Sequence, residues 1–450
     1  MGPIRRQLLD MITREDRYDL PAAELDPLRL EAARELFAER REQIPVLRKR
    51  AEESGVTEIR SFHDLVPLLF AHTVYKSYPQ NLVDQGKWSA LGRWLKTLSV
   101  EDPTTVDVSA VRNVDDWIDT MRAHGHLLLA TSGSSGKVSF LNSTRGDLEM
   151  KKRHWQHTLG WPYLTPNKDR VVFNLGPSQG PNSAIEASQI GAELWGKPGS
   201  IHFLTDEPLK ISEVSAMAAL RKRMQEGTAT PQEIADMEKR AQEQGARMME
   251  ALNRLVDTIL AHRDQPIILT GMWAQHMAII RRARELGIPD GAWHPKSYIS
   301  AGGGVKGVSL PPDYVEQVDR FWGKVIRGTG YGMTEMLQLF PRCEKRRYHC
   351  PPGLIMLLLD QPGEKLISPA VGSAGVVEGR FGFLDLMYEG RWGGLITGDK
   401  VQIDFSSRCE CGRHGPTILD TIVRYTQVTG QDDHIGCAGT IDAYVRGAMT

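Results

Sequence analysis

Ala130-Thr-Ser-Gly-Ser-Ser-Gly-Lys137 is the stretch of sequence that first points to a fold and a chemistry. It follows the apolar run His126–Ala130. Its glycines let the backbone bend and approach a phosphate closely, its hydroxyl and amide groups donate hydrogen bonds, and Lys137 adds a positive charge. The common P-loop does not match, because Thr131 and Val138 replace its first Gly and its Ser/Thr. We therefore predict a phosphate-binding loop, with a flexible polar loop as the alternative.

Further short apolar runs follow this segment, and each ends in a turn. They are Val171–Leu175, Ile267–Thr270, Ser297–Ala301 and Lys324–Arg327. Helical patterns lie between several of them. Such alternation predicts an α/β fold with an at least partly parallel sheet flanked by helices. Ligands of such sheets bind beyond the carboxyl ends of the strands, where the loops lie.

Two of these loops are rich in glycine. Gly302-Gly-Gly-Val-Lys-Gly307 matches a dinucleotide fingerprint, but the next strand lacks the acidic residue that a nicotinamide or flavin site requires. The loop still suits contact with a flat ligand such as adenine. In Gly328-Thr-Gly-Tyr-Gly-Met-Thr-Glu335, Tyr331 can lie against a purine, and Thr334 and Glu335 offer oxygen ligands for Mg²⁺. A plain strand-to-helix turn is the alternative.

A fourth segment, Leu395-Ile-Thr-Gly-Asp399, ends a predicted strand with a carboxylate. That carboxylate can accept two hydrogen bonds from a ribose diol, although a turn aspartate explains it equally well in isolation. In their order along residues 126–440, the four segments together resemble the adenylate-forming superfamily of acyl-CoA synthetases, peptide-synthetase adenylation domains and luciferases. Within it the chain is most similar to phenylacetate–CoA ligases and their relatives, among them acyl-protein synthetases and the adenylating enzymes of phenazine antibiotic biosynthesis.

The resemblance implies a fold and a reaction. The fold is an α/β large N-terminal domain, with mixed and parallel sheets flanked by helices and a small β-rich part. The reaction is ATP-dependent adenylation of a carboxylic acid to acyl-AMP with release of pyrophosphate, followed by transfer to a thiol or amine acceptor. Two other uses of the site stay open: activation of a non-carboxylate oxyanion, and a non-catalytic adenylation-fold subunit. Intact Lys137, Glu335 and Asp399 argue against the second.

The resemblance also implies a role for each matching residue. The phosphates would contact Thr131, Ser132, Gly133, Ser134, Ser135, Gly136 and Lys137, and the adenine would contact Gly302, Gly303, Gly304, Tyr331 and Gly332. Glu335 would bind Mg²⁺, Thr334 would lie near the α-phosphate, and Asp399 would bind the ribose. Trp273, His276 and Gly302 fall in the acyl pocket, where they suit an aromatic or otherwise flat acid; core packing is the equal alternative for Trp273.

The C-terminal segment departs from the family pattern. Thr429–Ile435 resembles the family's hinge, with Gln431 in place of an Arg, for which Arg424 or Arg446 can substitute. No Lys follows Lys400, so we predict that the family's mobile C-terminal domain and its Lys are absent. Coenzyme A, a carrier protein and a small amine all stay open as the acceptor, and a homodimer or a partner protein stays open as the assembly.

Cysteines form two close pairs about 60 residues apart, Cys343 with Cys350 and Cys409 with Cys411. Four thiolates make the usual structural Zn²⁺ site, and four protein ligands leave no open position for catalysis. The phenylacetate–CoA ligase branch often carries a metal here, which favours zinc over buried reduced thiols. His349 is a competing ligand beside Cys350.

Composition and length limit the remaining classes. The 450 residues carry a formal net charge of −1, which gives no general attraction to nucleic acid or to an anionic membrane. There is no signal-peptide pattern and no apolar run of about 18 residues, so we expect a cytoplasmic protein. We expect a helical cover over residues 1–125, an α/β core over 126–345 with a charged two-helix insertion at 211–262, and a β-rich part over 346–450.

Overall fold

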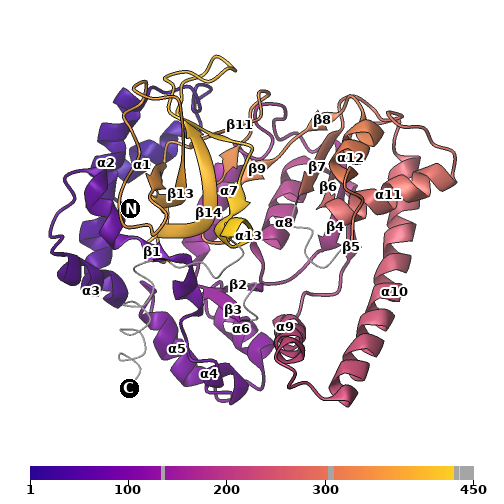
Figure 1. The fold of residues 1–450 in the computed structure, drawn as a ribbon, viewed down its shortest axis with the longest axis horizontal. Coiled ribbons are helices and arrows are strands. Elements are labelled where there is room, and N and C mark those ends of the chain that lie inside the picture. The colour runs from indigo at the N-terminus through magenta and orange to yellow at the C-terminus, as the bar shows by residue number, and fades with distance from the viewer. Residues whose placement is uncertain (133–136, 303–308, 430–434, 436–450) are drawn as a thin grey trace. The chain divides into compact units, whose positions relative to one another are not determined.

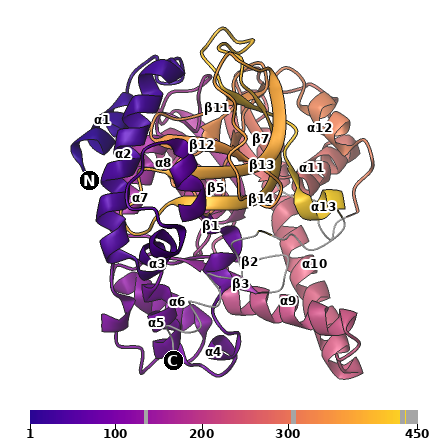
Figure 2. The ribbon, with the colours of Figure 1, turned by 60° about the vertical axis from the view of Figure 1, so that its left-hand side comes forward.

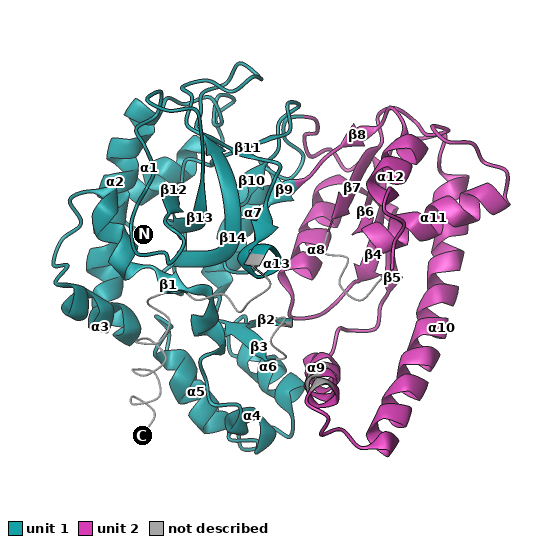
Figure 3. Ribbon diagram, in the orientation of Figure 1, with its two compact units in different colours: residues 1–162, 330–450 teal, residues 163–329 magenta. Residues whose placement is uncertain are grey.

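The computed structural model describes residues 1–132, 137–302, 309–429 and Ile435. The chain divides into two compact units (Figure 3): unit 1 comprises Met1–Pro162 and Gly330–Thr450, and unit 2 comprises Tyr163–Thr329. This division differs from the boundaries at residues 126 and 346 that the sequence predicts. The physical reason is a long-range strand pairing within unit 1, where Phe70 lies beside Leu395.

Unit 2 contains the parallel sheet that the alternating pattern predicts. In spatial order its strands are β5 (Gly196–Thr205), β4 (Arg170–Pro177), β6 (Ile267–Met272), β7 (Tyr298–Gly302) and β8 (Ile326–Arg327), and every neighbouring pair is parallel. The α/β class is therefore confirmed. The predicted run at 126–130 is the exception, because it belongs to unit 1 and pairs with an antiparallel neighbour.

Helices of unit 2 cover its sheet (Figure 1). They are α8 (Ser183–Trp195), the C-terminal part of α10 (Pro231–Ala261), α11 (Trp273–Glu285) and α12 (Tyr314–Trp322), whereas α9 (Ile211–Gln225) packs against α10. The end of α10 packs with α11 and α12 on Phe173 and Leu269 of the sheet, through residues such as Val256, Ile280 and Trp322. This cluster is the hydrophobic core of unit 2.

The predicted two-helix insertion is confirmed as α9 and α10. Gly227 adopts a left-handed conformation between them, with φ of 69°. Thr230 then caps α10: its backbone amide donates to Glu233 Oε2 at 2.9 Å, and the Glu233 amide donates to Thr230 Oγ1 at 3.3 Å. Residues 241–250 of α10 are all exposed, as expected of a solvated charged face.

Unit 1 contains a mixed sheet that is seven-stranded among the described residues (Figure 2). Its central path is β11 (Arg347–His349), β15 (Thr417–Leu419), β14 (Gly394–Asp404), β13 (Val376–Asp385) and β12 (Leu354–Leu359). Two short strands also pair with β14: β1 (Phe70–Ala71) in parallel and β16 (Val423–Arg424) antiparallel. The β-rich part expected over residues 346–450 thus contains β12, β13 and β14.

The remaining elements of unit 1 are mostly short. The helices are α1 (Pro3–Met11), α2 (Ala22–Gln43), α3 (Pro45–Ser54), α4 (Asn81–Asp84), α5 (Trp88–Lys96), α6 (Val114–Ala123), α7 (Arg145–Trp155) and α13 (Tyr425–Thr429), with 3₁₀ turns η1 (Phe62–Leu68), η2 (His72–Lys76) and η3 (Pro103–Thr105). The other strands are β2 (Leu129–Ser132), β3 (Val138–Leu141), β9 (Gly330–Tyr331) and β10 (Phe340–Pro341). The region 1–125, for which a helical cover is expected, contains α1 to α6, and α2 buries Ala32, Leu36 and Phe37. Over the described part of the chain, no helix has the length and apolarity needed to cross a membrane.

Candidate functional site

A carboxylate, a phenol and a guanidinium meet within unit 1. Tyr331 on β9 donates its hydroxyl hydrogen to Asp399 Oδ2 at 2.7 Å. Arg424 contacts the other carboxylate oxygen at 2.9 Å and lies opposite Asp399 where β16 pairs with β14. Burial, followed by the Asp399 charge, holds the pKa of Tyr331 well above its usual value. The phenol therefore keeps its proton and fixes the carboxylate that the sequence assigns to ribose.

Glu335 lies in the electrostatic field of this cluster. Burial raises its pKa by disfavouring the charged form, Arg391 and Arg424 oppose the shift, and Asp399 adds to it. A cation placed beside such a carboxylate would stabilise its charged form, and Mg²⁺ takes carboxylate and phosphate oxygens together. The donor set therefore fits a divalent cation. Gly332 and Thr334 lie between Tyr331 and Glu335, on the same turn.

The lysine of the first segment lies at the end of the β2–β3 hairpin, in which Thr131 pairs with Ser139. Lys137 Nζ donates to the carbonyl oxygen of Tyr78 and lies 4.3 Å from the centroid of that ring. The Tyr78 hydroxyl in turn donates to the carbonyl oxygen of Val138 at 2.8 Å. Residues 133–136, which include Ser134 and Ser135, lie outside the described residues, so the phosphate role of this loop stays a prediction.

Sequence reasoning missed Lys76, Tyr78 and Arg391. Lys76 ends η2, which packs against β3 and β14. Burial lowers the pKa of its ammonium group, and the charge of Glu335 opposes that shift, which puts Lys76 in the field of the same site. No local motif marks these residues. Their placement depends on the pairing of β1 with β14, a contact between distant parts of the chain that local patterns do not reveal.

Unit 2 contains the residues predicted for the acyl pocket. The structure places one of them, His276, in the core. It has no exposed surface, its Nδ1 accepts from the Trp322 indole at 3.0 Å, and its Nε2 lies 3.3 Å from the Ser300 carbonyl oxygen. A buried imidazole with both nitrogens engaged is a core residue. Trp273 is partly buried and packs edge-on against Tyr314 at 5.3 Å. Gly302 ends β7, and Gly303 and Gly304 lie outside the described residues.

Two similar tight hairpins in unit 1 bring together a set of metal-ligand side chains. In one, the amide of Cys343 donates to the Arg347 carbonyl at 2.9 Å; in the other, the amide of Cys409 donates to the Arg413 carbonyl at 2.8 Å. One ligand atom from each of four residues lies within 4.8 Å of all the others; the residues are Cys343, His349, Cys409 and Cys411. Three thiols and an imidazole at this spacing fit a tetrahedral Zn²⁺ site.

The fourth ligand of this proposed metal site is His349, and not Cys350 as the sequence predicts. The Cys350 sulfur lies 3.3 Å from the carbonyl oxygen of Leu354 and accepts from Arg29 at 3.5 Å, outside the cluster. The reason is strand alternation: β11 ends at His349, which points with the thiols, so its neighbour cannot. Within the cluster, a hydrogen bond from Cys409 lowers the pKa of Cys343, because it stabilises the thiolate form.

Comparison with known proteins gives distant likenesses. No protein-family model and no curated protein sequence matches the chain. Among solved structures it is similar to ATP-bound MatB from Rhodopseudomonas palustris (15% identity over 64% of this chain and 47% of that one, TM-score 0.37). It is also similar to a red-emitting luciferase from Phrixothrix hirtus (11% identity, 62% and 42%, TM-score 0.32). A third is the adenylation domain of a keto acid-selecting NRPS module bound to a keto acyl adenylate (9% identity, 67% and 51%, TM-score 0.35). The chain thus spans about half the length of these proteins, and such low TM-scores do not establish a shared fold.

Proposed function

We propose that this chain is an adenylate-forming enzyme that activates a carboxylic acid with ATP. The observation that carries the proposal is the convergence of Tyr331, Glu335, Asp399 and Arg424. Tyr331 and Glu335 share one turn, and Asp399 and Arg424 come from β14 and β16, yet hydrogen bonds, an ion pair and mutual electrostatic fields join the four residues in one unit. The sequence patterns and the family resemblance predict a role at the nucleotide for Tyr331, Glu335 and Asp399, and they offer Arg424 as the substitute for the family's hinge arginine.

The proposed chemistry follows from what these side chains can do. Asp399, fixed by Tyr331 and Arg424, accepts hydrogen bonds from the ribose diol. Lys137 leaves the Tyr78 carbonyl to contact the phosphates. Mg²⁺, held by Glu335, would supply neutralisation of phosphate charge. The substrate carboxylate oxygen then forms a bond to the α-phosphorus as the bond to the β-phosphate breaks, so pyrophosphate leaves with its electron pair. Positioning and charge neutralisation are the main sources of rate.

Finer points of the proposal concern the substrate and the cell. We propose an aromatic or similarly flat acid, a phenylacetate–CoA ligase-like branch, and a role in secondary metabolism such as antibiotic biosynthesis, in the cytoplasm. The acyl group would then pass to a thiol or amine. With His276 assigned to the core, Trp273 and Gly302 remain as the proposed acyl-pocket residues of unit 2.

ATP–pyrophosphate exchange tests the reaction. The full chain is assayed with Mg²⁺ and without coenzyme A against a panel of aryl, heteroaryl and fatty acids. Exchange with one class of acid, lost in Asp399→Asn, supports adenylation and names the substrate class. ATP binding without exchange for any acid contradicts adenylation of these acids and favours a non-carboxylate oxyanion or a non-catalytic subunit.

We also propose a structural Zn²⁺ at Cys343, His349, Cys409 and Cys411. It would join the hairpin after β10 to the hairpin before β15, close to the sheet that carries Asp399. Four protein ligands leave no position for substrate, so the ion would stabilise this part of unit 1 and take no part in the reaction. Elemental analysis of the purified chain tests this directly: a metal-free protein contradicts it.

A further inference from the structure

Arg391 is a buried cation that the proposed chemistry does not use. Its side chain has no exposed surface. One terminal nitrogen donates to the Thr334 carbonyl oxygen at 3.1 Å and also to the Tyr388 hydroxyl, and the other donates to the Asn142 carbonyl oxygen at 3.4 Å. The guanidinium lies 4.0 Å from the centroid of the Tyr388 ring and 5.5 Å from that of Tyr75.

Keeping this charge in the interior is costly. Burial works against the charged form, and the surrounding tyrosines and Asp147 outweigh it, so the pKa of Arg391 is raised and the group stays charged. Buried ionic groups are weak evidence for stability, because well-packed apolar side chains often stabilise as well or better. A function for Arg391 is therefore better sought in what it holds in place.

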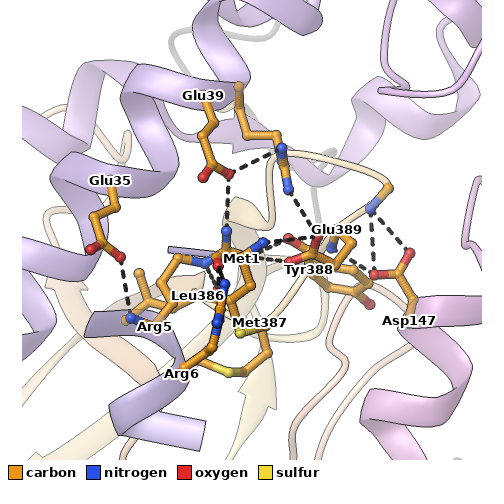
Figure 4. A network of polar contacts seen from close by, with 12 residues as sticks. Met1, Arg5, Arg6, Glu35, Glu39, Asp147, Leu386, Met387, Tyr388 and Glu389 are labelled. Carbon is orange, nitrogen blue, oxygen red and sulfur yellow. Dashed lines mark hydrogen bonds and ion pairs between the residues drawn. The ribbon is translucent and has the colours of Figure 1, made fainter. Parts of the chain in front are cut away.

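The loop 386–393 that carries Arg391 is itself tightly fixed. Asp147 Oδ1 accepts from the Glu389 amide at 2.7 Å. Arg5 of α1 donates to the carbonyl oxygens of Leu386 at 2.7 Å and Tyr388 at 2.8 Å (Figure 4). Arg5 has no exposed surface and also pairs with Glu389 at 3.0 Å. Contacts from two distant helices, α1 and α7, thus hold the backbone on the N-terminal side of Arg391.

Glycines on both sides of Arg391 show how closely this loop is fitted. A Cβ at Gly390 would lie 2.7 Å from Asp147 Oδ2. Gly393 has a φ of 80°, and a Cβ there would lie 2.4 Å from the Asp385 carbonyl oxygen. Both positions therefore require glycine for the loop to close against its neighbours. The backbone that carries the Arg391 side chain therefore has little freedom to shift.

The segment 385–391, which includes Arg391, also fixes the C-terminal side of the turn that contains Glu335. Asp385, at the end of β13, has no exposed surface, and its Oδ2 accepts from the amides of Leu337 and Gln338, both at 2.9 Å. Arg391 holds the carbonyl of Thr334 on the N-terminal side. Glu335 and Met336 are thus the two residues between these backbone anchors, both supplied by the segment 385–391.

We propose that Arg391 is a positioning residue for the nucleotide site, which fixes Thr334 and thereby aims the Glu335 carboxylate. This inference rests on the proposed function and extends it to a residue that contacts neither ATP nor metal. Because the anchor acts through hydrogen-bond geometry as well as charge, Lys at this position keeps the charge but loses the planar fork, in which separate nitrogens donate to the carbonyls of Thr334 and Asn142.

The test compares Arg391→Lys with wild type by two readouts. Hydrogen exchange followed by mass spectrometry on residues 330–340 reports on the turn whether or not the chain is an enzyme. We expect faster exchange in Arg391→Lys at Met336, Leu337 and their neighbours, with other peptides unchanged. In pyrophosphate exchange we expect a fall in kcat of about 10–100-fold, the usual effect of losing a group that orients a metal ligand, with a smaller change in KM for ATP.

Controls separate positioning from loss of fold. Arg50→Lys is the matched control, since Arg50 is also buried and donates to a carbonyl, that of Pro67, at 2.8 Å. It should leave the exchange of residues 330–340 and the activity unchanged. Tyr388→Phe removes only one hydroxyl contact of Arg391 and serves if Arg391→Lys fails to fold. We expect it to loosen the same peptide to a smaller degree.

Unchanged exchange at 330–340 in a folded Arg391→Lys, or in Tyr388→Phe where that is the only folded variant, overturns the proposal. So does a fall in activity that Arg50→Lys matches. A wild type without adenylation activity would instead contradict the proposed function, and the hydrogen-exchange result would still decide whether Arg391 anchors the turn.

Discussion

At the scale of one residue, the carboxylate of Glu335, which we propose as a metal ligand, should reduce the stability of the ligand-free protein. Its pKa is raised by burial, so the folded chain holds this proton more tightly than the unfolded chain. A group of this kind stabilises folding below its unfolded pKa, and the contribution is lost as the pH rises through the folded pKa. At neutral pH the ligand-free chain therefore bears the cost of a partly buried carboxylate.

We predict opposite effects of Glu335→Gln on stability and on activity. Without ligand, the melting temperature of the variant should exceed that of the wild type at pH 7–8, and the gap should close near pH 4, where the carboxyl group is protonated in both states. Mg²⁺-dependent exchange should fall by about 100-fold or more, beyond the usual loss from a residue that only supports a metal ligand. Melting curves across this pH range and exchange rates provide the measurements. A variant that loses stability in proportion to activity would contradict the assignment.

A second prediction concerns the hydroxyl of Tyr331. Hydrogen bonds to charged groups contribute about 1.5–3 kcal/mol, or roughly 10–100-fold in binding. Tyr331→Phe should therefore raise KM for ATP by about 10-fold or more, because Asp399 loses the donor that fixes it. Tyr348→Phe is the matched control: its hydroxyl donates to Asp420 Oδ1 at the comparable distance of 2.8 Å. Equal effects of the two substitutions on KM would mean that the Asp399 contact is not specific to ATP.

At the scale of elements, two hairpins far apart in the sequence have the same construction. A backbone bridge joins Arg342 to Tyr348 in one and Arg408 to His414 in the other, and each hairpin begins its turn with a cysteine. In the first hairpin, the backbone amides of Lys345 and Arg347 donate to the Cys343 sulfur, so the turn would support the thiolate as a ligand of the proposed metal. Sequence reasoning found the two loops from the pairs of cysteines. It could not choose between His349 and Cys350, because that choice depends on the strand pairing of β11 with β15.

Substitutions in these hairpins should separate the ligands from the neighbouring thiol. Cys409→Ser should reduce zinc from about one ion per chain to near zero and should lower the melting temperature, because a lost ligand opens the tetrahedral site. Cys350→Ser is the control, since its sulfur lies outside the cluster, and it should keep the full metal content. Elemental analysis and melting curves measure both. Loss of metal in Cys350→Ser as well as in Cys409→Ser would restore the ligand set inferred from sequence, and retention of metal in Cys409→Ser would contradict both ligand sets.

At the scale of the whole molecule, the sequence predicts features that have local signals, and it does not predict features that depend on contacts between distant segments. Apolar runs are local signals, and they predict strands β4, β6 and β7. The run at 126–130 was assigned to the parallel sheet, but it pairs with β3 instead, and no local feature distinguishes the two. The sequence pattern places His276 in the acyl pocket, because it does not reveal that the indole of Trp322 donates a hydrogen bond to the buried imidazole.

The same division holds for the candidate site. Tyr331, Glu335 and Asp399 were found because each lies in a recognisable loop. Lys76 and Arg391 were not, since each lies in an ordinary stretch of sequence and reaches the site only through the fold. A prediction based on motifs therefore misses residues of this kind. Lys76 lies in η2, which packs against β14, and Arg391 lies in the loop that precedes β14.

Nucleotide binding provides a prediction for the whole chain that does not require turnover. A ligand that binds only the folded state stabilises it by about 2.7 kcal/mol at a concentration of 100 times Kd. Mg²⁺–ATP should therefore raise the melting temperature and slow hydrogen exchange around Tyr331–Glu335 and Asp399. Residues 241–250 of α10, which are exposed throughout, should show no protection.

Asp399→Asn should abolish most of this shift at the same ATP concentration, because the neutral amide cannot accept the ribose hydrogen bonds and pair with Arg424 as the carboxylate does. Arg50→Lys should retain it. A shift that survives in Asp399→Asn with protection moved to another segment would place the nucleotide elsewhere, and the role of the Tyr331–Asp399–Arg424 cluster would have to be sought in the stability of unit 1. A shift that disappears only in Asp399→Asn would tie ATP to the cluster whatever the acid substrate proves to be.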